Sequence, residues 1–396
     1  MTVLVIGPGG REHALALALA QDPVVAAVHV APGNPGTAQV ATNHPVEADN
    51  PAAVAALAQE LMVDLVVVGP EAPLVAGVAD AVRDAGIACF GPSGAAARIE
   101  GSKAFAKEVM AAAGVPTGGS VLCRTDDELT AALDRFGPPY VVKDDGLAAG
   151  KGVVVTEDRR VAVDHGRACG AVIVEEYLAG PEVSLFAITD GTTVLPLQPA
   201  QDFKRVGDGD IGPNTGGMGA YTPLPWADDD LVDTVMDTVI GPTVDELRRR
   251  GTPFVGLLYA GLAITEAGPK VIEFNARFGD PETQALLPLL ATGLGRVLYT
   301  AATGRLAEIG ALQWNPGAAV TVVVASQNYP DAPVTGGVIT GVDQVADGAH
   351  VIQAGTATDD EGRLVAAGGR VLAVVGTGAY LTEARHAAYA SLAGID

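Results

Sequence analysis

Cysteine and basic residues are both scarce in this chain of 396 residues. The three cysteines, Cys89, Cys123 and Cys169, are far apart and show no CxxC spacing, which argues against a disulfide framework and against a zinc site. We expect them to be buried thiols. Lysine and arginine number 24 against 47 acidic residues, giving a formal net charge of −23. Binding to nucleic acid or to an anionic membrane surface needs clustered positive charge, so both are disfavoured.

Long apolar runs are missing as well. The longest, near residues 318–325, is much shorter than the roughly 18 residues that a membrane-spanning helix needs. Residues 14–20 could imitate the core of a signal peptide, but no basic segment precedes them and they follow a predicted strand. We therefore expect a cytoplasmic protein, and the acidic composition favours a monomer.

Apolar residues, by contrast, make up 48% of the chain, enough to build the cores of two to four domains. Strand patterns at residues 2–6, 28–31, 65–68 and 88–90 alternate with alanine-rich helical stretches. This alternation predicts a doubly wound parallel sheet over residues 1–101. Ligands of such sheets bind beyond the carboxyl ends of the strands.

Three loops follow those strand ends. The turn containing Gly9 and Gly10 precedes a helix and can offer backbone amides to a phosphate. Glu12 occupies the place of the third glycine in the dinucleotide fingerprint, so a mononucleotide or sugar phosphate fits better than NAD. The loops containing Asn34 and Glu71 are ordinary turns or further ligand contacts, and the Glu71 carboxylate could accept ribose hydroxyls.

A glycine-rich hairpin stands between two β-branched runs within residues 140–155. Its glycines allow backbone N–H groups to approach an anion, and Lys143 and Lys151 can neutralise phosphate charge. The P-loop pattern is not satisfied, because Asp145 replaces its first glycine and Gly152 its hydroxyl residue. A plain turn is the alternative.

A helix capped by Ser102 begins a second domain, and residues 116–182 predict a small α+β unit. Its last strand ends at residues 175–178, which could present backbone groups to an adenine ring or form a solvated acidic turn. Residues 201–219 predict a long glycine-rich loop, either functional or a flexible linker. Residues 294–396 predict a final α+β unit, to which we assign a packing role.

One strand carries Glu273, Asn275 and Arg277 at alternate positions, so these side chains should share one face. Two oxygen ligands suit Mg²⁺ bound jointly with nucleotide phosphates, and the guanidinium suits a carboxylate or a transferring phosphoryl group. The alternative is the polar outer face of an edge strand.

Several ordered stretches resemble the phosphoribosylamine–glycine ligase family of ATP-grasp enzymes, also called glycinamide ribonucleotide synthetases, over nearly the whole chain. They are residues 9–13 (GGREH), 32–34 (PGN), 69–77 (GPEAPLVAG), 100–103 (EGSK), 145–151 (DGLAAGK), 205–209 (RVGDG), 213–219 (PNTGGMG) and 278–283 (FGDPET). The resemblance implies condensation of 5-phosphoribosylamine with glycine, coupled to conversion of ATP to ADP and phosphate. A related carboxylase or amine ligase and a non-catalytic nucleotide-binding regulator are the alternatives.

The resemblance also implies an α/β and α+β multidomain fold. Its parts would be an N-terminal Rossmann-like domain (1–101), an ATP-grasp domain (102–293) with a small lid at about 116–182, and a C-terminal α+β domain (294–396).

Carried over to this sequence, the resemblance assigns roles to individual residues. ATP would be bound by Lys103 and Lys143 at its phosphates, by the closing loop with Gly146, Gly150, Lys151 and Gly152, by the adenine hinge Glu175, Glu176, Tyr177 and Leu178, and by Glu182 at the ribose. Mg²⁺ or Mn²⁺ would be held by Glu273 and Asn275. The substrates would be met by Arg277 at glycine's carboxylate or its phosphorylated form, by Gly9, Gly10 and Glu71 at the ribosylamine, and by Asn34, Asn214 and Asp280. Lys143, Arg277, Asp202 and Lys204 complete the catalytic candidates.

Overall fold

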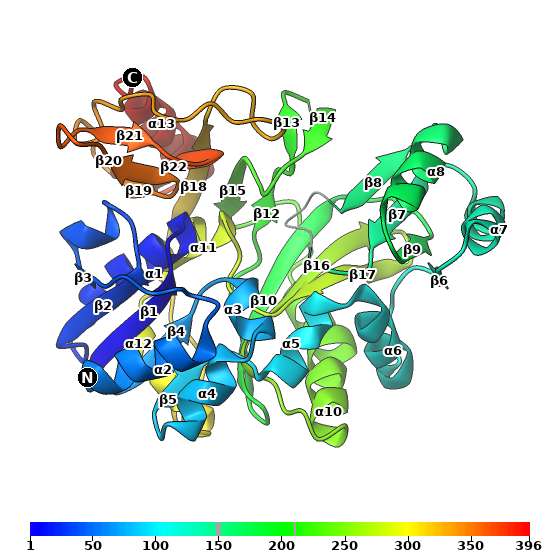
Figure 1. Ribbon diagram of the computed structural model, residues 1–396, viewed down its shortest axis with the longest axis horizontal. Helices are drawn as coiled ribbons and strands as arrows, with labels where there is room; N and C mark the ends of the chain where they lie inside the picture. Colours follow the sequence, from blue (N-terminus) through cyan, green and yellow to red (C-terminus); the bar gives the residue numbers. More distant parts are fainter. Residues whose placement is uncertain (148–151, 210) are drawn as a thin grey trace.

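Four main β-sheets organise the computed structural model, which describes residues 1–147, 152–209 and 211–396 (Figure 1). Gly150 and Lys151 of the predicted glycine-rich loop lie outside the described residues. No helix in the described ranges is long and apolar enough to cross a membrane.

The N-terminal sheet is parallel, with strand order β3-β2-β1-β4-β5, and confirms the predicted doubly wound arrangement. Residues 3–6 of the central strand are fully buried, which explains its unbroken apolar run. The strands are β1 (Thr2–Gly7), β2 (Ala27–Pro32), β3 (Thr42–Asn43), β4 (Leu65–Val68) and β5 (Ala88–Phe90). The helices are α1 (Gly10–Ala20), α2 (Pro51–Glu60), α3 (Glu71–Val75), α4 (Val78–Asp84) and α5 (Gly94–Gly101).

Helix α6 (Lys103–Ala113) leads into a small unit that stands apart on the right of Figure 1. Ser102 caps this helix, because its hydroxyl accepts a hydrogen bond from the Phe105 amide, and Gly114 ends it in the left-handed conformation. The small unit is an antiparallel sheet of order β6-β9-β7-β8 with two helices. Its elements are β6 (Ser120–Cys123), α7 (Asp126–Phe136), β7 (Tyr140–Asp144), β8 (Val153–Thr156), α8 (Arg159–Ala168) and β9 (Val172–Glu175).

The central sheet has strand order β11-β10-β16-β17 and runs through the middle of the molecule (Figure 1). Its strands are β10 (Glu182–Asp190), β11 (Val194–Pro196), β16 (Val255–Thr265) and β17 (Gly268–Asn275). Two helices of the same region are α9 (Leu231–Val235) and α10 (Gly241–Arg249). Strand β17 lies at the sheet edge, where Thr117 forms a parallel bridge with Val271.

The last sheet, of order β12-β15-β18-β22-β19, draws strands from two distant parts of the chain. Its strands are β12 (Gln201–Asp202), β15 (Gly219–Thr222), β18 (Ala318–Ala325), β19 (Ala349–Gln353) and β22 (Arg370–Gly378). A boundary at residue 293 therefore does not separate the central region from this sheet. The remaining strands and α-helices are the hairpins β13 (Arg205–Gly207)–β14 (Ile211–Asn214) and β20 (Thr356–Thr358)–β21 (Leu364–Ala366), and helices α11 (Glu282–Leu286), α12 (Leu294–Ala302) and α13 (Leu381–Leu392).

Residues 201–219, expected to be one long loop, thus contain four short strands or strand starts. Gln201 pairs with Tyr221, and Gly219 pairs with Val322, so the backbone partners of this stretch lie up to about a hundred residues away in the chain. The glycine-rich composition hides these non-local pairings from a sequence-based prediction.

One apolar core joins the N-terminal, central and last sheets. It contains Val5 of β1, Phe186 of β10 and Val375 of β22. The small unit has a separate core, which includes Leu133 and Val174. The three large sheets therefore pack around a shared core, whereas the small unit is joined to them through α6, the Thr117–Val271 bridge and the hydrogen bond from Lys143 to Ile272.

Candidate active site

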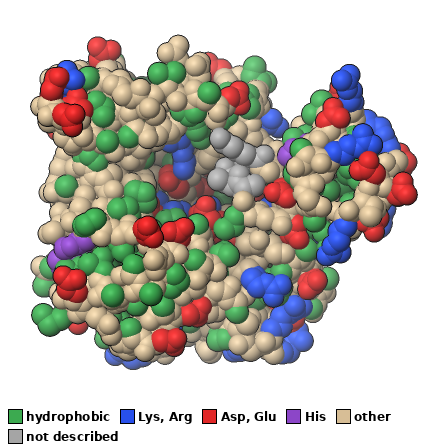
Figure 2. Space-filling model, in the orientation of Figure 1, with side chains coloured by type: hydrophobic (Ala, Val, Ile, Leu, Met, Phe, Trp, Pro, Cys, Tyr) green, Lys and Arg blue, Asp and Glu red, His purple; other side chains and the backbone are tan. Residues whose placement is uncertain are grey.

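A cavity of about 520 Å³ opens where the N-terminal, central and last sheets meet. Figure 2 shows acidic and basic side chains gathered in a recess near the centre of this face of the molecule. The cavity is lined by Pro8, Gly9, Gly10, Gly33, Asn34, Gly216, Asp280, Tyr329, Ala354, Gly355, Thr356, Ala367, Gly369 and Arg370. Most of these residues are small, so the backbone itself forms much of the wall.

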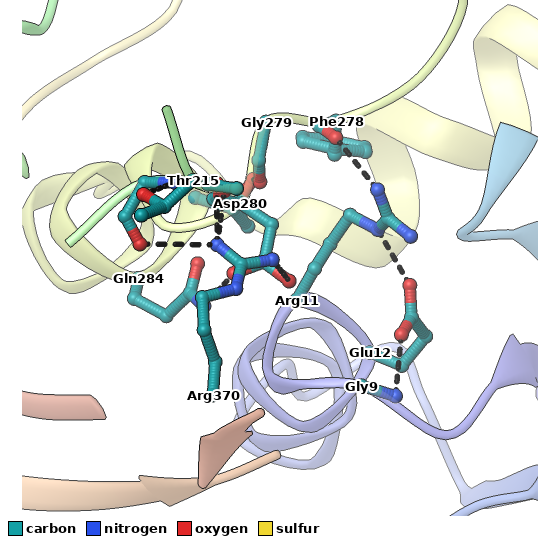
Figure 3. Close-up of polar contacts among 12 residues, drawn as sticks. Gly9, Arg11, Glu12, Thr215, Phe278, Gly279, Asp280, Gln284 and Arg370 are labelled. Carbon is teal, nitrogen blue, oxygen red and sulfur yellow. Dashed lines mark hydrogen bonds and ion pairs between the residues drawn. The ribbon is translucent and has the colours of Figure 1, made fainter. Parts of the chain in front are cut away.

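The glycine turn after β1 has one of its amides already paired. Gly9 N–H donates to Oε2 of Glu12 at 2.7 Å, and the Arg11 side chain donates to the other Glu12 oxygen at 2.5 Å (Figure 3). Glu12 is almost fully buried. Glu12, which replaces the third glycine of the dinucleotide fingerprint, therefore stabilises the turn. Gly9 has no side chain, so its Cα faces the cavity directly.

Asn34 also lines the cavity, but its side chain is fully committed inside the protein. Its Nδ2 donates to the carbonyls of Pro8 and Gln353, at 2.8 and 3.0 Å. Its Oδ1 accepts from the amides of Gly36 and Thr37, at 2.8 and 3.0 Å. The predicted substrate role of Asn34 therefore rests on shaping the wall, since no side-chain donor or lone pair is left over.

A group of lysines and carboxylates lies between the central sheet and the small unit. Lys143 Nζ is 3.0 Å from Oε2 of Glu175 and donates to the carbonyl of Ile272 at 2.9 Å. Lys107, which the sequence did not single out, pairs with the other Glu175 oxygen at 3.2 Å. Lys103 donates to the carbonyl of Gly146 at 2.9 Å. Lys143 and Glu175 are both buried, so their charges act in a weakly screened environment.

The predicted adenine hinge begins where β9 ends. The Glu175 side chain points to the two lysines, while Glu176 accepts a hydrogen bond from the Gly119 amide at 3.0 Å. Tyr177 is 46% exposed. Residues 176–179 are irregular, so their backbone is not part of the sheet ladder. Glu182, at the start of β10, pairs with Lys204 at 2.8 Å.

Glu273 and Asn275 lie opposite Gly261 and Tyr259 in the ladder between β16 and β17, with the buried Phe274 between them on the other face. Burial alone would raise the pKa of Glu273, but the charges of Lys204, Lys143 and Lys103 bring it below its ordinary value. This carboxylate therefore stays ionised beside three lysines, in a setting suited to an anionic ligand accompanied by a cation.

Arg277 lies just beyond the end of β17 and joins the strand to the N-terminal sheet. Its guanidinium contacts Glu71 and Glu100, each at 3.2 Å, and donates to Oδ1 of Asn275 at 3.2 Å. Burial opposes ionisation of Glu71, yet the charges of Arg277 and Arg11 hold its pKa below the usual range. The sequence analysis did not identify Glu100 as a site residue, although it begins the EGSK motif at residues 100–103. Only the fold brings Glu100 to Arg277.

Asp202 and Lys204 lie beside a buried hydroxyl network. Ser184 Oγ contacts Tyr259 at 2.7 Å and Glu282 at 3.1 Å, and lies 3.5 Å from Asp202. Burial raises the pKa of Asp202 to about 7; Lys204 opposes this shift, and nearby carboxylates including Glu282 add to it. Asp202 can therefore exchange a proton near neutral pH.

The C-terminal unit does more than pack, contrary to the role that the sequence suggested. Arg370 at the start of β22 pairs with Asp280 at 3.1 Å, and both line the cavity (Figure 3). Asn214 does not line it; the neighbouring Gly216 does. Arg370 had no local signal, because its partners lie 90 or more residues earlier in the chain.

Comparison with known proteins gives matches along almost the whole chain. Family models described as phosphoribosylglycinamide synthetase N domain, ATP-grasp (A) domain and C domain match residues 1–100, 101–283 and 319–396. A phosphoribosylamine–glycine ligase of Streptomyces coelicolor is 65% identical, covering all of this chain and 96% of the relative. One from Mycobacterium tuberculosis is 59% identical, covering 100% and 95%.

Solved structures agree with these matches. The crystal structure of phosphoribosylamine–glycine ligase from Thermotoga maritima has a TM-score of 0.88 at 33% identity and covers 100% of this chain and 97% of that one. An N5-carboxyaminoimidazole ribonucleotide synthetase in complex with ADP has a TM-score of 0.71 at 18% identity, with 99% and 96% coverage. The second likeness concerns the fold alone.

Proposed function

This chain belongs to the phosphoribosylglycinamide synthetase family, and from that membership we propose that it joins glycine to 5-phosphoribosylamine while converting ATP to ADP and phosphate. The product is glycinamide ribonucleotide, an intermediate of purine biosynthesis. The observation that best supports this activity is the run from Glu273 to Asp280, which leads from the lysine–carboxylate group directly to the glycine-lined cavity. A nucleotide and a sugar phosphate would thus meet at one strand end.

ATP would bind between the central sheet and the small unit. Lys103 and Lys143 would neutralise its phosphates, the backbone of residues 176–178 would meet adenine, and Glu182 would meet the ribose. Gly146 and Gly152, the described ends of the predicted glycine-rich loop, would lie near the phosphates. Lys107 supports this arrangement, because it pairs with one Glu175 oxygen while Lys143 pairs with the other, which fixes the end of β9 where the hinge begins.

The donor set at the end of β17 fits a divalent cation shared with the nucleotide. The described residues form no group of three or more His, Cys, Asp or Glu side chains that could hold a metal by themselves. Mg²⁺ bound to nucleotide phosphates needs only one or two protein ligands, and Glu273 and Asn275 offer hard oxygens. We propose that they hold Mg²⁺ or Mn²⁺, which supplies charge neutralisation for phosphoryl transfer.

The chemistry would proceed in two steps. A glycine carboxylate oxygen attacks the γ-phosphorus of ATP, ADP leaves, and glycyl phosphate forms. The ribosylamine nitrogen then attacks the acyl carbon, the C–O bond to phosphate breaks, and the nitrogen loses a proton. A carboxylate is a poor electrophile until its oxygen becomes a leaving group, so the order is fixed. Exclusion of water protects the intermediate from hydrolysis.

Particular side chains would serve these steps. Arg277, held by Glu71 and Glu100, would orient glycine's carboxylate. Asp202, with a pKa of about 7, would accept the proton from the attacking nitrogen, and Lys204 would balance its charge. Gly9, Gly10, Glu71, Asn34 and Asp280 would surround the ribosylamine.

Glycine-dependent ADP release tests this function. The protein is incubated with Mg-ATP and 5-phosphoribosylamine, with and without glycine. A ligase releases ADP only when both co-substrates are present. A nucleotide-binding regulator would bind ATP without glycine-dependent release, and that result would refute the proposal. The predicted cytoplasmic location and monomeric state stay predictions, the latter to be tested by light scattering.

A further inference from the structure

We propose that Arg370 is a positioning residue for binding of the ribosylamine, acting through a clamp on the Gly216–Gly217 peptide rather than by touching the substrate. The clamp consists of Arg370, Tyr329, Gly216, Gly217 and Asp280. The inference rests on the proposed function, because it assigns the glycine-lined cavity to the phosphoribosylamine.

Arg370 gathers two chain segments that are far apart in sequence. Its Nη1 donates to the carbonyl of Gly216 at 2.6 Å, to that of Gly217 at 3.4 Å and to that of Asp280 at 2.8 Å. Its Nη2 lies 3.1 Å from Oδ2 of Asp280. Figure 3 shows the guanidinium between the residue 215–217 segment and the Asp280 turn.

Tyr329 holds the same peptide from its other side. Its hydroxyl accepts a hydrogen bond from the Gly216 amide at 3.0 Å. Both polar groups of Gly216 are thus held by the C-terminal unit. Gly217 has φ of +107°, and a Cβ at this position would lie 2.5 Å from Cδ of Pro281. The segment therefore lies directly on the turn that carries Asp280, and only glycine allows that approach.

The clamp also reaches the catalytic candidates. The Thr215 amide and hydroxyl both donate to the carbonyl of Lys204, at 2.7 and 2.9 Å. Lys204 in turn pairs with Glu182 and lies close to Asp202. Displacement of Gly216 would consequently disturb one wall of the cavity and the backbone of Lys204 together.

Engagement of the guanidinium argues for positioning. Three carbonyls surround Nη1 and the Asp280 carboxylate pairs with Nη2, so four contacts fix the position of the Arg370 guanidinium, whose side chain is 22% exposed. Release of these partners to bind a substrate anion would leave Asp280 and the glycine carbonyls without their donor.

Two single variants and their double variant test the clamp by steady-state kinetics and thermal unfolding. Arg370→Lys keeps the positive charge but loses the planar guanidinium that donates to several acceptors at once. We expect the KM for 5-phosphoribosylamine to rise about tenfold. Tyr329→Phe leaves the guanidinium untouched and removes one hydrogen bond, so the same KM should rise about threefold. The KM for ATP should change less in both, because Lys103 and Lys143, which would bind the ATP phosphates, pair with Gly146 and Glu175 outside the clamp.

Arg363→Lys is the matched control. Arg363 lies in the same unit, pairs with Asp359 and is half-exposed, and the variant should keep wild-type KM values. Because both clamp variants act on the Gly216 peptide, their effects in the double variant should combine less than additively.

The other outcomes overturn the clamp. A raised KM in Arg370→Lys with an unchanged KM in Tyr329→Phe would mean that Arg370 contacts the substrate itself. A lowered kcat with unchanged KM values would indicate a merely structural role. Failure of the wild-type protein to release ADP with glycine would instead refute the proposed function, which the variants do not test.

Discussion

At the scale of single residues, the charge of Glu273 distinguishes a metal ligand from a polar residue on an edge strand. Glu273→Gln keeps the size of the side chain and removes that charge. We expect turnover to fall at least about tenfold, in line with the loss of other charge-stabilising groups. Glu266→Gln, at an exposed turn between β16 and β17, is the matched control. Near-normal activity of Glu273→Gln at limiting Mg²⁺ would remove Glu273 from the metal site.

Asp202 makes a pH prediction. Its pKa of about 7 lies above the ordinary value of 3.8, so the carboxylate is mostly protonated below pH 7 and cannot accept a proton there. Activity should therefore rise with pH through about 7. Asp202→Asn should lower the rate and abolish this limb in the pH profile. The same limb in the variant would assign the ionisation to another group.

Some residue roles could be predicted from sequence and others could not. Glu273 and Asn275 stand two apart on β17 as predicted, whereas Arg277 lies beyond the end of the strand and still contacts Asn275. Asn34 occurs in the PGN motif at residues 32–34, but only the fold shows that its side chain forms four hydrogen bonds inside the protein. Arg370 depends wholly on partners from distant segments.

At the scale of elements, the sequence was sufficient to predict those helices and strands whose signals lie within their own residues. Helix α7, at residues 126–136 of the predicted α+β unit, begins with such a signal, a capping box between Thr125 and Glu128. The strands at residues 65–68 and 88–90 have the predicted bounds. The prediction of a loop at residues 201–219 was wrong, because the strands observed there depend on pairing with β18 and with each other. The glycines of this stretch carry no strand signal.

His13 connects α1 to β19 and gives the fold a pH-dependent contact. Its Nδ1 accepts a hydrogen bond from the Gln353 amide at 2.9 Å. Burial lowers the pKa of His13 from 6.5 to about 4. The unfolded chain therefore takes up the proton first as pH falls. The stability contributed by neutral His13 is fully present above pH 6.5 and is lost as pH falls toward 4.

At about 1.4 kcal/mol per pKa unit, this loss amounts to about 3 kcal/mol. Denaturant unfolding of the wild type and of His13→Asn, each at pH 7 and pH 4.5, measures it as a difference in pH dependence. His386→Asn, at an exposed position of α13, is the control. Equal pH dependence in wild type and His13→Asn would contradict the assignment.

At the scale of the whole molecule, the site exists only because three sheets share one core. The N-terminal sheet supplies the glycine turn, the central sheet supplies Glu273 and Asn275, and the last sheet supplies Arg370. The small unit with its own core adds Lys143 and Glu175. The proposed nucleotide subsite therefore lies at the small unit, and the proposed sugar-phosphate cavity lies between the three sheets that share a core.

The fate of one oxygen atom tests the central claim most directly. If glycine's carboxylate attacks the γ-phosphorus, one of its oxygens bridges to phosphate and leaves with it when the amine attacks. Glycine labelled with ¹⁸O in its carboxylate is turned over with ATP and 5-phosphoribosylamine, and the inorganic phosphate is examined by mass spectrometry. We predict one labelled oxygen per phosphate released. Unlabelled phosphate would mean that the oxygen came from water, and would contradict the glycyl phosphate intermediate.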